Sequence, residues 1–231
     1  MVSPEQCLGL STEGLTEVPW HKGMLCRKAA LEAFVALRES AAAAGFELDI
    51  ASAWRSFERQ YLIFDDKFNG RRQVLDAQEQ PLDLSLFTPA QKVAAIVRFS
   101  AIPGFSRHHF GSEFDIYAPN LLPPGQTLQL TAWEYSEQGY FHELGQWLDR
   151  HLKDFGFFRP YQGSGSVAAE PWHISHGESA APCESAFNLP TALALLKNRG
   201  ASWYAEVKAL LEHHFELLPV THGEHYVRAN S

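Results

Sequence analysis

Residues that can bind a metal ion crowd into two short stretches, SRHHFGSEFD at 106–115 and EPWHISH at 170–176. A hydrolytic zinc site needs three protein ligands, usually histidine and carboxylate, with a fourth position open for water. It also needs a carboxylate that is not a ligand and takes the proton from that water. The two stretches together hold three candidate ligands and one candidate base: His108, Asp115, His173 and Glu170.

The spacing of these residues is compatible with one metal site but does not establish it. His108 precedes the strand that we expect to carry Asp115, and Gly111 between them permits a tight approach of the chain. Residues 170 and 173 share a face on a helix, whereas on a flat strand they lie on opposite faces. Pro171 favours an irregular or edge segment. Spacing alone therefore does not decide whether these residues lie around one metal ion.

A second interpretation of the same histidines is structural. The chain contains eleven histidines, so some lie near an aspartate by chance, and a single histidine is most often a hydrogen-bonding residue. His109, next to His108, is the alternative ligand.

The candidate residues are expected to lie on a mixed scaffold of helices and strands. Apolar spacing and capping residues predict helices at 27–44, 58–68, 88–100, 137–155, 190–198 and 202–217, and strands at 46–54 and around 114–116. The polar stretch 71–87 is expected to be irregular. Because helices and strands do not alternate strictly, the pattern favours the α+β class. No repeat or internal linker interrupts it, so we expect a single domain over 1–231.

Composition narrows the class of protein further. The net charge is −8, and no run of Lys or Arg provides the electrostatic surface that a nucleic-acid-binding protein needs. The N-terminal residues carry neither a basic start nor an apolar run, and no window approaches a membrane span. Cys7, Cys26 and Cys183 are odd in number and widely spaced, which indicates reduced thiols. These features predict a cytoplasmic enzyme without nucleic-acid or membrane partners.

Three motifs resemble those of one known family. SRHHFGSEFD resembles the S-x-H-x-x-G-x-A-x-D signature of the VanY-like D-alanyl-D-alanine carboxypeptidases, which belong to the LAS metallopeptidases. EPWH at 170–173 resembles the second signature of that family, and SAWRSFERQ at 52–60 resembles the S-x-x-R-S-x-x-x-Q stretch that precedes both. The motifs occur in the family's order and span about half of the chain.

The resemblance implies a fold and a role for each matching residue. The implied fold is a small antiparallel sheet flanked by helices, with Zn²⁺ in an open cleft. Glu170 matches the general base, and Arg55 matches the arginine that steadies the scissile carbonyl oxygen or the substrate carboxylate. The other implied roles are those of the zinc ligands His108, Asp115 and His173 and of the substrate-pocket residues Gln60 and Ser106.

Two residues depart from the family pattern. Glu113 replaces the usual small residue two positions before Asp115, and we expect it to support the site or the core. His176 stands where a tyrosine often follows the EPWH signature. It is a candidate substrate contact, with a structural role as the alternative.

The implied substrate is a peptidoglycan stem peptide. Without an export signal the enzyme would meet imported wall fragments, which favours an L,D-carboxypeptidase that trims tetrapeptides during muropeptide recycling. The alternative is a D,D-carboxypeptidase or D,D-dipeptidase that acts on D-Ala-D-Ala termini. A hypothesis from another functional class is a non-catalytic cell-wall-binding module stabilised by zinc. Glu170 argues against that module, because a purely structural metal site needs no free carboxylate.

Overall fold

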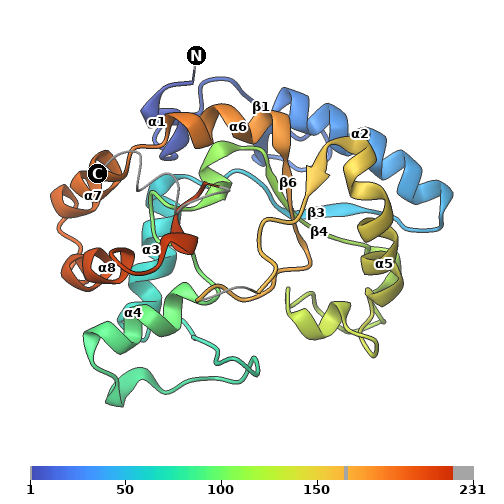
Figure 1. The fold of residues 1–231 in the computed structure, drawn as a ribbon. Helices are drawn as coiled ribbons and strands as arrows, with labels where there is room; N and C mark the ends of the chain where they lie inside the picture. Colours follow the sequence, from blue (N-terminus) through green and yellow to red (C-terminus); the bar gives the residue numbers. More distant parts are fainter. Residues whose placement is uncertain (1, 164–165, 221–231) are drawn as a thin grey trace.

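The computed structural model describes residues 2–163 and 166–220, and its elements form a four-stranded antiparallel sheet with helices around it (Figure 1). The strand order in the sheet is β3-β4-β6-β5, and β1 and β2 form a separate hairpin. The strands are β1 Leu15–Glu17, β2 Leu25–Arg27, β3 Asp49–Ser52, β4 Glu113–Tyr117, β5 Phe157–Phe158 and β6 His173–His176. The helices are α1 Pro4–Cys7, α2 Lys28–Ala43, α3 Phe57–Phe68, α4 Pro89–Val97, α5 His142–His151, α6 Gly177–Ala186, α7 Leu189–Asn198 and α8 Tyr204–Leu211. The predicted α+β class with a small antiparallel sheet is confirmed.

One face of the sheet is covered by α2 and α5. Phe114, Ile116 and Ile174 point from β4 and β6 into a core that also contains side chains of these two helices. The rings of Phe34 on α2 and Phe114 lie 5.1 Å apart. In Figure 1, α2 and α5 lie above and to the right of the sheet. This apolar packing leaves the opposite face of β4 and β6 free for polar residues.

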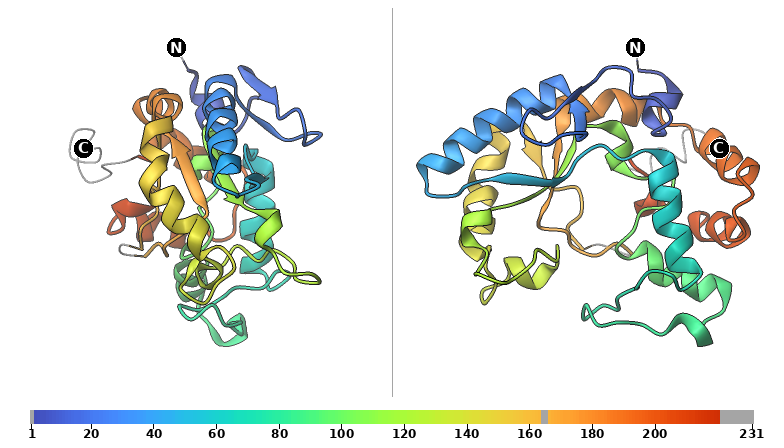
Figure 2. Two further views of the ribbon diagram at one scale, coloured as in Figure 1. Left: turned by 90° about the vertical axis from the view of Figure 1, so that its right-hand side faces the viewer. Right: turned by 180° about the vertical axis from the view of Figure 1, so that it is seen from behind.

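A second core joins the helices α3, α4, α7 and α8, which gather on the left of the sheet in Figure 1 and on its right in the rear view of Figure 2. Its largest buried side chain, Trp203, packs against Phe64 of α3 with ring centroids 4.5 Å apart. Helix α4 begins as predicted, with Thr88 as N-cap and Pro89 in the first turn. The second core therefore holds α3 at its position beside the sheet.

Several sequence-based boundaries were wrong. The helix expected at 137–155 begins only at His142 and continues as a 3₁₀ turn from Leu152. The helix expected at 202–217 ends at Leu211 and is followed by a separate 3₁₀ turn at 215–217. Helix α6, which has Pro182 in its interior, was not expected at all. In these segments tertiary contacts outweigh local propensity.

Two further expectations concern the cysteines and membranes. All three cysteines are free and buried, in agreement with the prediction of thiols. Within the described part of the chain, no helix is long and apolar enough to cross a bilayer.

Gly111 provides a test of how tightly the loop before β4 is packed. Its φ is 74°, and a Cβ there would lie 2.6 Å from Leu15 Cδ2. We expect Gly111→Ala to lower the free energy of unfolding by about 2 to 5 kcal/mol, because backbone strain and overpacking add. Urea unfolding measures this change.

Gly125→Ala is the matched control. Gly125 has a φ of 83° with nothing within 4 Å of its Cβ position, so it should incur only the backbone cost of about 1 to 2 kcal/mol. Equal losses in the two variants would show that the contact with Leu15 does not matter.

Candidate zinc-binding active site

The register of β4 and β6 places the candidate metal ligands opposite each other. Asp115 pairs with His173 and Glu113 pairs with Ser175 in this antiparallel pair. Because side chains two positions apart lie on the same face of a strand, these four side chains share the face that points away from α2. Asp115 Oδ1 lies 3.0 Å from His173 Nδ1.

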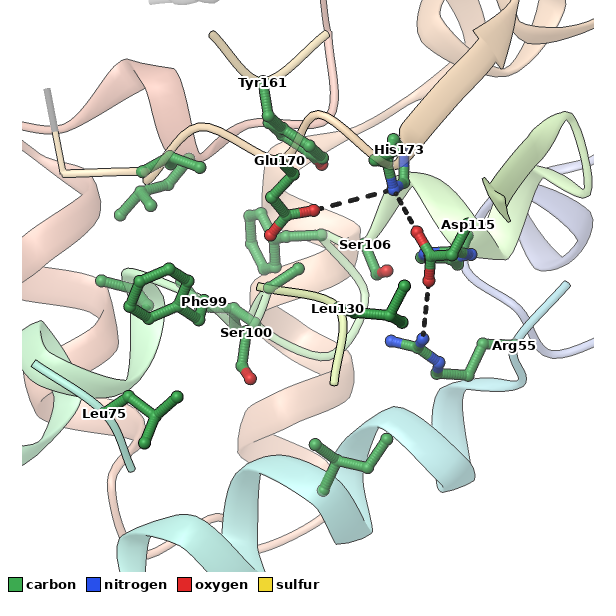
Figure 3. A pocket seen from close by; sticks show the side chains of 18 of the residues that line it. Arg55, Leu75, Phe99, Ser100, Ser106, Asp115, Leu130, Tyr161, Glu170 and His173 are labelled. Carbon is green, nitrogen blue, oxygen red and sulfur yellow. Dashed lines mark hydrogen bonds and ion pairs between the residues drawn. The ribbon is translucent and has the colours of Figure 1, made fainter. Parts of the chain in front are cut away.

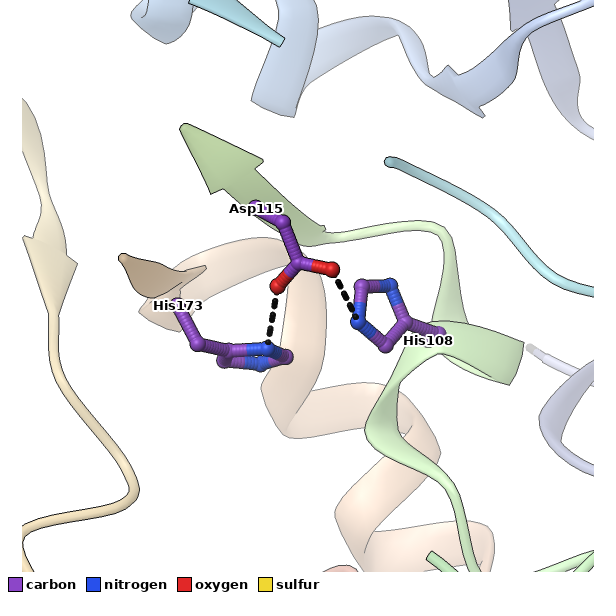
Figure 4. A group of neighbouring side chains, drawn as sticks. All are labelled: His108, Asp115 and His173. Atoms are coloured by element: carbon purple, nitrogen blue, oxygen red, sulfur yellow. Dashed lines mark hydrogen bonds and ion pairs between the residues drawn. The ribbon is translucent and has the colours of Figure 1, made fainter. Parts of the chain in front are cut away.

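His108 reaches the same point from a 3₁₀ turn at Arg107–Phe110, which Gly111 terminates in a left-handed conformation. Its Nδ1 donates to the carbonyl oxygen of Ala53 at 2.7 Å. This bond leaves Nε2 as the free nitrogen, 3.3 Å from Asp115 Oδ2 (Figure 4). A backbone carbonyl thus fixes both the orientation and the tautomer of the ring.

The three side chains fit a zinc ion. Among the described residues, His108, Asp115 and His173 form the group whose ligand atoms all lie within 4.8 Å of one another. Tetrahedral zinc with bonds of about 2 Å holds its ligand atoms about 3.3 Å apart. His173 Nδ1 lies 3.0 Å from Oδ1 of Asp115 and His108 Nε2 lies 3.3 Å from Oδ2, so each nitrogen is at about this distance from one oxygen of the carboxylate. Two imidazoles and one carboxylate leave the fourth position open.

His109, the alternative ligand, points elsewhere. Its Nδ1 donates to the carbonyl oxygen of Arg55 at 2.7 Å, and its Nε2 accepts from the backbone N–H of Gly104 at 3.0 Å. Burial lowers the pKa of His109 to about 3, so the ring is neutral and both nitrogens are occupied. The structure therefore makes His109 a structural residue.

Glu170 is brought to the metal site by a turn. The backbone N–H of His173 donates to the carbonyl oxygen of Glu170 at 3.0 Å, and Pro171 occupies the second position of this turn. The turn resolves the question that the three-residue spacing left open, because it puts both side chains on one side. Glu170 Oε2 lies 3.7 Å from His173 Nδ1 (Figure 3). Burial raises the pKa of Glu170 to about 7.

Arg55 stands on the other side of the carboxylate of Asp115. Its Nη2 lies 3.9 Å from Asp115 Oδ2 and donates to Ser52 Oγ at 3.1 Å. Its Nη1 donates to Gln60 Oε1 at 2.7 Å. Gln60 is fully buried and donates in turn to the carbonyl oxygen of Ala101. The structure therefore places Gln60 behind Arg55, where it orients the guanidinium, and not on the cavity wall.

The candidate residues open onto a cavity of about 310 Å³. Arg55, Ser106, Glu170 and the three ligand candidates all contribute to its lining. Tyr161, which sequence reasoning missed, also lines it and packs on the ring of His173 at 4.9 Å. Tyr161 stands in an irregular segment outside the three motifs, so no local signal in the sequence marks it.

His176 does not reach this cavity. It lies three residues after His173 on the same strand, so it points to the opposite face of the sheet. There its ring packs on Phe157 at 5.2 Å, and its Nδ1 lies 2.8 Å from Ser179 Oγ. These contacts agree with the structural role of His176, and its side chain lies outside the cavity lining.

Glu113 supports His173 from behind the metal position. Glu113 Oε2 accepts from His173 Nε2 at 2.9 Å, while Nδ1 of the same ring faces Asp115. The carboxylate is fully buried and pairs with Arg107, and it also accepts from the hydroxyls of Ser112 and Ser175. Burial would raise the pKa of Glu113, but Arg107 and His173 outweigh it and lower the pKa to about 2.

The same carboxylates determine the charge of His173. Burial would lower the pKa of this imidazole, but the hydrogen bonds to Asp115 and Glu113 raise it to about 10. A metal ion at Nδ1 would replace one proton, and Glu113 would retain the proton on Nε2. This carboxylate–histidine arrangement is the one by which proteins orient a metal-binding imidazole.

Comparison with known proteins identifies the family. The sequence profile of VanY, described as D-alanyl-D-alanine carboxypeptidase, matches residues 23–178 and so covers well over half of the 231 residues. The chain therefore belongs to the VanY family, in agreement with its three motifs.

Two relatives match parts of the chain. An uncharacterized protein of Haemophilus influenzae is 50% identical over 78 residues, which are 32% of this chain and 60% of that protein. A D-alanyl-D-alanine carboxypeptidase of Enterococcus faecalis is 29% identical over 144 residues, which are 61% of this chain and 44% of that protein. Each alignment thus spans less than two thirds of the relative.

Two solved structures share the fold. The D,D-pentapeptidase VanY, as a mutant in complex with Zn(II), aligns with a TM-score of 0.51 and 24% identity over 75% of this chain and 89% of that one. The LD-carboxypeptidase LdcB aligns with a TM-score of 0.50 and 20% identity over 85% of this chain and 78% of that one.

The contact between Glu113 and His173 predicts an effect on metal affinity. We expect Glu113→Gln to weaken Zn²⁺ binding about 10- to 100-fold, because the imidazole loses its charged acceptor. Competition with a chromophoric chelator, on protein shown to be folded, measures this loss.

Glu184→Gln is the matched control. Glu184 accepts from Arg107 at 2.7 Å, so this variant also removes a carboxylate from the network around Arg107. If both variants lost the same Zn²⁺ affinity, the cause would be the network around Arg107 and not the contact with His173.

Proposed function

We propose that this chain is a zinc-dependent carboxypeptidase that removes the terminal D-alanine from peptidoglycan tetrapeptides, an L,D-carboxypeptidase reaction. The observation that carries the proposal is a free carboxylate, Glu170, beside a two-histidine, one-aspartate ligand set that opens onto a cavity. A purely structural zinc site is closed by four protein ligands. The arrangement therefore favours hydrolysis over the cell-wall-binding alternative.

Each residue has a defined task in this proposal. Zinc, when bound, supplies Lewis-acid polarisation of the scissile carbonyl and acidifies water. Glu170 takes a proton from the attacking water and passes it to the leaving amine of D-alanine. With its pKa raised toward neutrality by burial, its carboxyl group can accept and return a proton near pH 7.

Arg55 supplies fixed positive charge on the cavity wall. Its guanidinium is held by Gln60 and Ser52, so it is already oriented before substrate arrives. A preorganised cation stabilises the negative charge that develops on the carbonyl oxygen, or it binds the substrate carboxylate in bidentate fashion. Ser106, almost fully buried on the same wall, adds a hydroxyl for the substrate backbone.

The choice between L,D and D,D cleavage depends on the residue before the cut. The LD-carboxypeptidase LdcB and the D,D-pentapeptidase VanY share the fold equally well, so the fold is compatible with cleavage of the tetrapeptide and does not select it. The D,D-carboxypeptidase alternative, which acts on pentapeptides that end in D-Ala-D-Ala, is favoured by the family description and by the Enterococcus faecalis relative. Both reactions would use the same ligands and the same base.

Mass spectrometry of zinc-loaded protein, incubated separately with tetrapeptide and pentapeptide fragments, tests the proposal. We expect the loss of one D-alanine from the tetrapeptide, and Glu170→Gln should slow it about 10²- to 10⁴-fold because the general base is removed. Loss from the pentapeptide alone would establish the D,D alternative.

Glu137→Gln, at an exposed glutamate outside the cavity lining, is the control and should leave the rate unchanged. Removal of zinc with a chelator should abolish the activity, and added Zn²⁺ should restore it. If neither fragment were cleaved by the zinc-loaded protein, the enzymatic assignment would be wrong.

A further inference from the structure

Lys67 introduces a second cation into the cavity wall, away from the metal ligands. It lies in the last turn of α3, four residues after Ile63, so both residues face the cavity from the same side of the helix. Its Nζ donates to Ser100 Oγ at 2.7 Å. Ser100 lies across the cavity from Asp115 and His173 in Figure 3, together with Phe99 and Leu75.

The hydroxyl of Ser100 accepts only one of the hydrogen bonds that the ammonium group of Lys67 can donate. A lysine ammonium has three N–H donors and carries a full charge, yet among the described residues no carboxylate forms an ion pair with it. The side chain is half-buried, and its neighbour Arg72 is another cation on the same wall. Burial, together with Arg72, lowers the pKa of Lys67 to about 8. Lys67 is therefore still mainly cationic at neutral pH.

The acidic residues close to Lys67 in the sequence are engaged elsewhere. Asp65 and Asp66, on the same helix, both accept from the guanidinium of Arg71. Side chains one or two positions apart on a helix do not face each other, so neither carboxylate could pair with Lys67 in any case. The chain instead directs both carboxylates to an exposed arginine.

Two acidic residues of the cavity wall, Glu79 and Glu216, are occupied as well. Glu79 accepts from the backbone N–H groups of Ala132 and Trp133. Glu216 accepts from the backbone N–H of Ser166 and lies 3.0 Å from His214 Nδ1. Glu170, which also lines the cavity, acts on the charge of Lys67 from a distance without an ion pair. The cavity thus presents an ammonium group with spare N–H donors and, among the described residues, no carboxylate within ion-pair distance.

We propose that Lys67, with Arg72 beside it, forms a subsite for a carboxylate of the substrate, separate from the group that Arg55 contacts. This inference rests on the proposed function, because it concerns the same cavity, and it assigns to the substrate a second point of charge recognition. Ser100 is the positioning residue of the subsite, since its hydroxyl fixes the ammonium against the wall.

Two carboxylates on the residues that flank the cut in a peptidoglycan stem peptide have this chemistry. One is the carboxylate of the terminal D-alanine, on the leaving side of the cut. The other is the side-chain carboxylate of a diaminodicarboxylic acid, on the acyl side. A stem peptide with L-lysine in place of the diaminodicarboxylic acid lacks only the second carboxylate, so the two peptides form a matched pair.

The test combines kinetics and binding for Lys67→Met. Steady-state rates of the zinc-loaded protein are measured with three tetrapeptides: the diaminodicarboxylic form, the L-lysine form, and the diaminodicarboxylic form ending in D-alaninamide. We expect Lys67→Met to lower kcat/KM for the first peptide about 10- to 100-fold, mainly through KM, because a charge-assisted hydrogen bond is lost.

The other two peptides identify the source of the carboxylate. If the loss disappears with the L-lysine peptide, the subsite binds the side-chain carboxylate. If it persists with the L-lysine peptide and disappears with the D-alaninamide peptide, the subsite binds the terminal carboxylate. Persistence with both peptides would overturn the assignment of the subsite to a residue that flanks the cut. Equal kcat/KM for Lys67→Met and the parent protein with all three peptides would overturn the subsite.

Three controls keep these outcomes interpretable. Lys67→Arg retains the charge and should recover most of the affinity, which a merely structural defect would not allow. Lys153→Met removes one exposed lysine outside the cavity lining and should behave as the parent. Thermal unfolding of each variant shows that it is folded.

Calorimetric titration of the same peptides in a Glu170→Gln background separates this inference from the proposed function. If no peptide is cleaved but Lys67→Met still weakens binding about 10-fold or more, the subsite stands and the proposed reaction fails. If the peptides are cleaved and Lys67→Met affects neither binding nor turnover, the subsite fails and the proposed reaction stands.

Discussion

The antiparallel register between β4 and β6 is the constraint on which the rest of the site depends. It places Asp115 opposite His173 and Glu113 opposite Ser175, so that one strand presents two carboxylates to one imidazole. A shift of one residue would turn all of these side chains into the core and bring Phe114 and Ile174 to the cavity. The apolar packing of those two residues against α2 and α5 prevents the shift. The hydrophobic core on one face of the sheet therefore fixes the polar site on the other.

Burial of so much negative charge requires compensation, and Arg107 provides it. Its guanidinium contacts Glu113, Glu184 and the hydroxyl of Ser175, and it also donates to the carbonyl oxygen of Pro219 near the end of the described chain. An isolated buried carboxylate would bind a proton and remain neutral. Paired with Arg107, Glu113 stays ionised and can hold the proton on His173 Nε2. Glu113 and Arg107, both within the first signature stretch, act as one unit.

The sequence predicted the members of the site better than their arrangement. The residue types in SRHHFGSEFD and EPWH made His108, Asp115, His173 and Glu170 candidates, and the resemblance to the family motifs selected His108 over its neighbour. The structure brings these four residues together. The turn at Pro171 could not be predicted, because a three-residue spacing has opposite meanings on a helix and on a strand. Glu113 was recognised as unusual, but its contact with His173 depends on strand pairing across 60 residues. Helix α6 was missed because Pro182 reads as a helix breaker.

Helix α3 contributes residues to both ends of the cavity, and only one of these residues could be selected from the sequence. Its first turn carries Gln60, which orients Arg55 beside the ligand set, and its last turn carries Lys67 at the opposite wall. The two are seven positions apart, which is about two helical turns or about 10 Å along the axis. Only the first of these residues lies within the family's motif, so only that one was selected from the sequence. Because the second core holds α3 rigidly through Phe64 and Trp203, the separation between Arg55 and Lys67 is fixed before substrate binds. A rigid pair of cations discriminates between substrates by the spacing of their negative groups, whereas a flexible pair would accept many spacings.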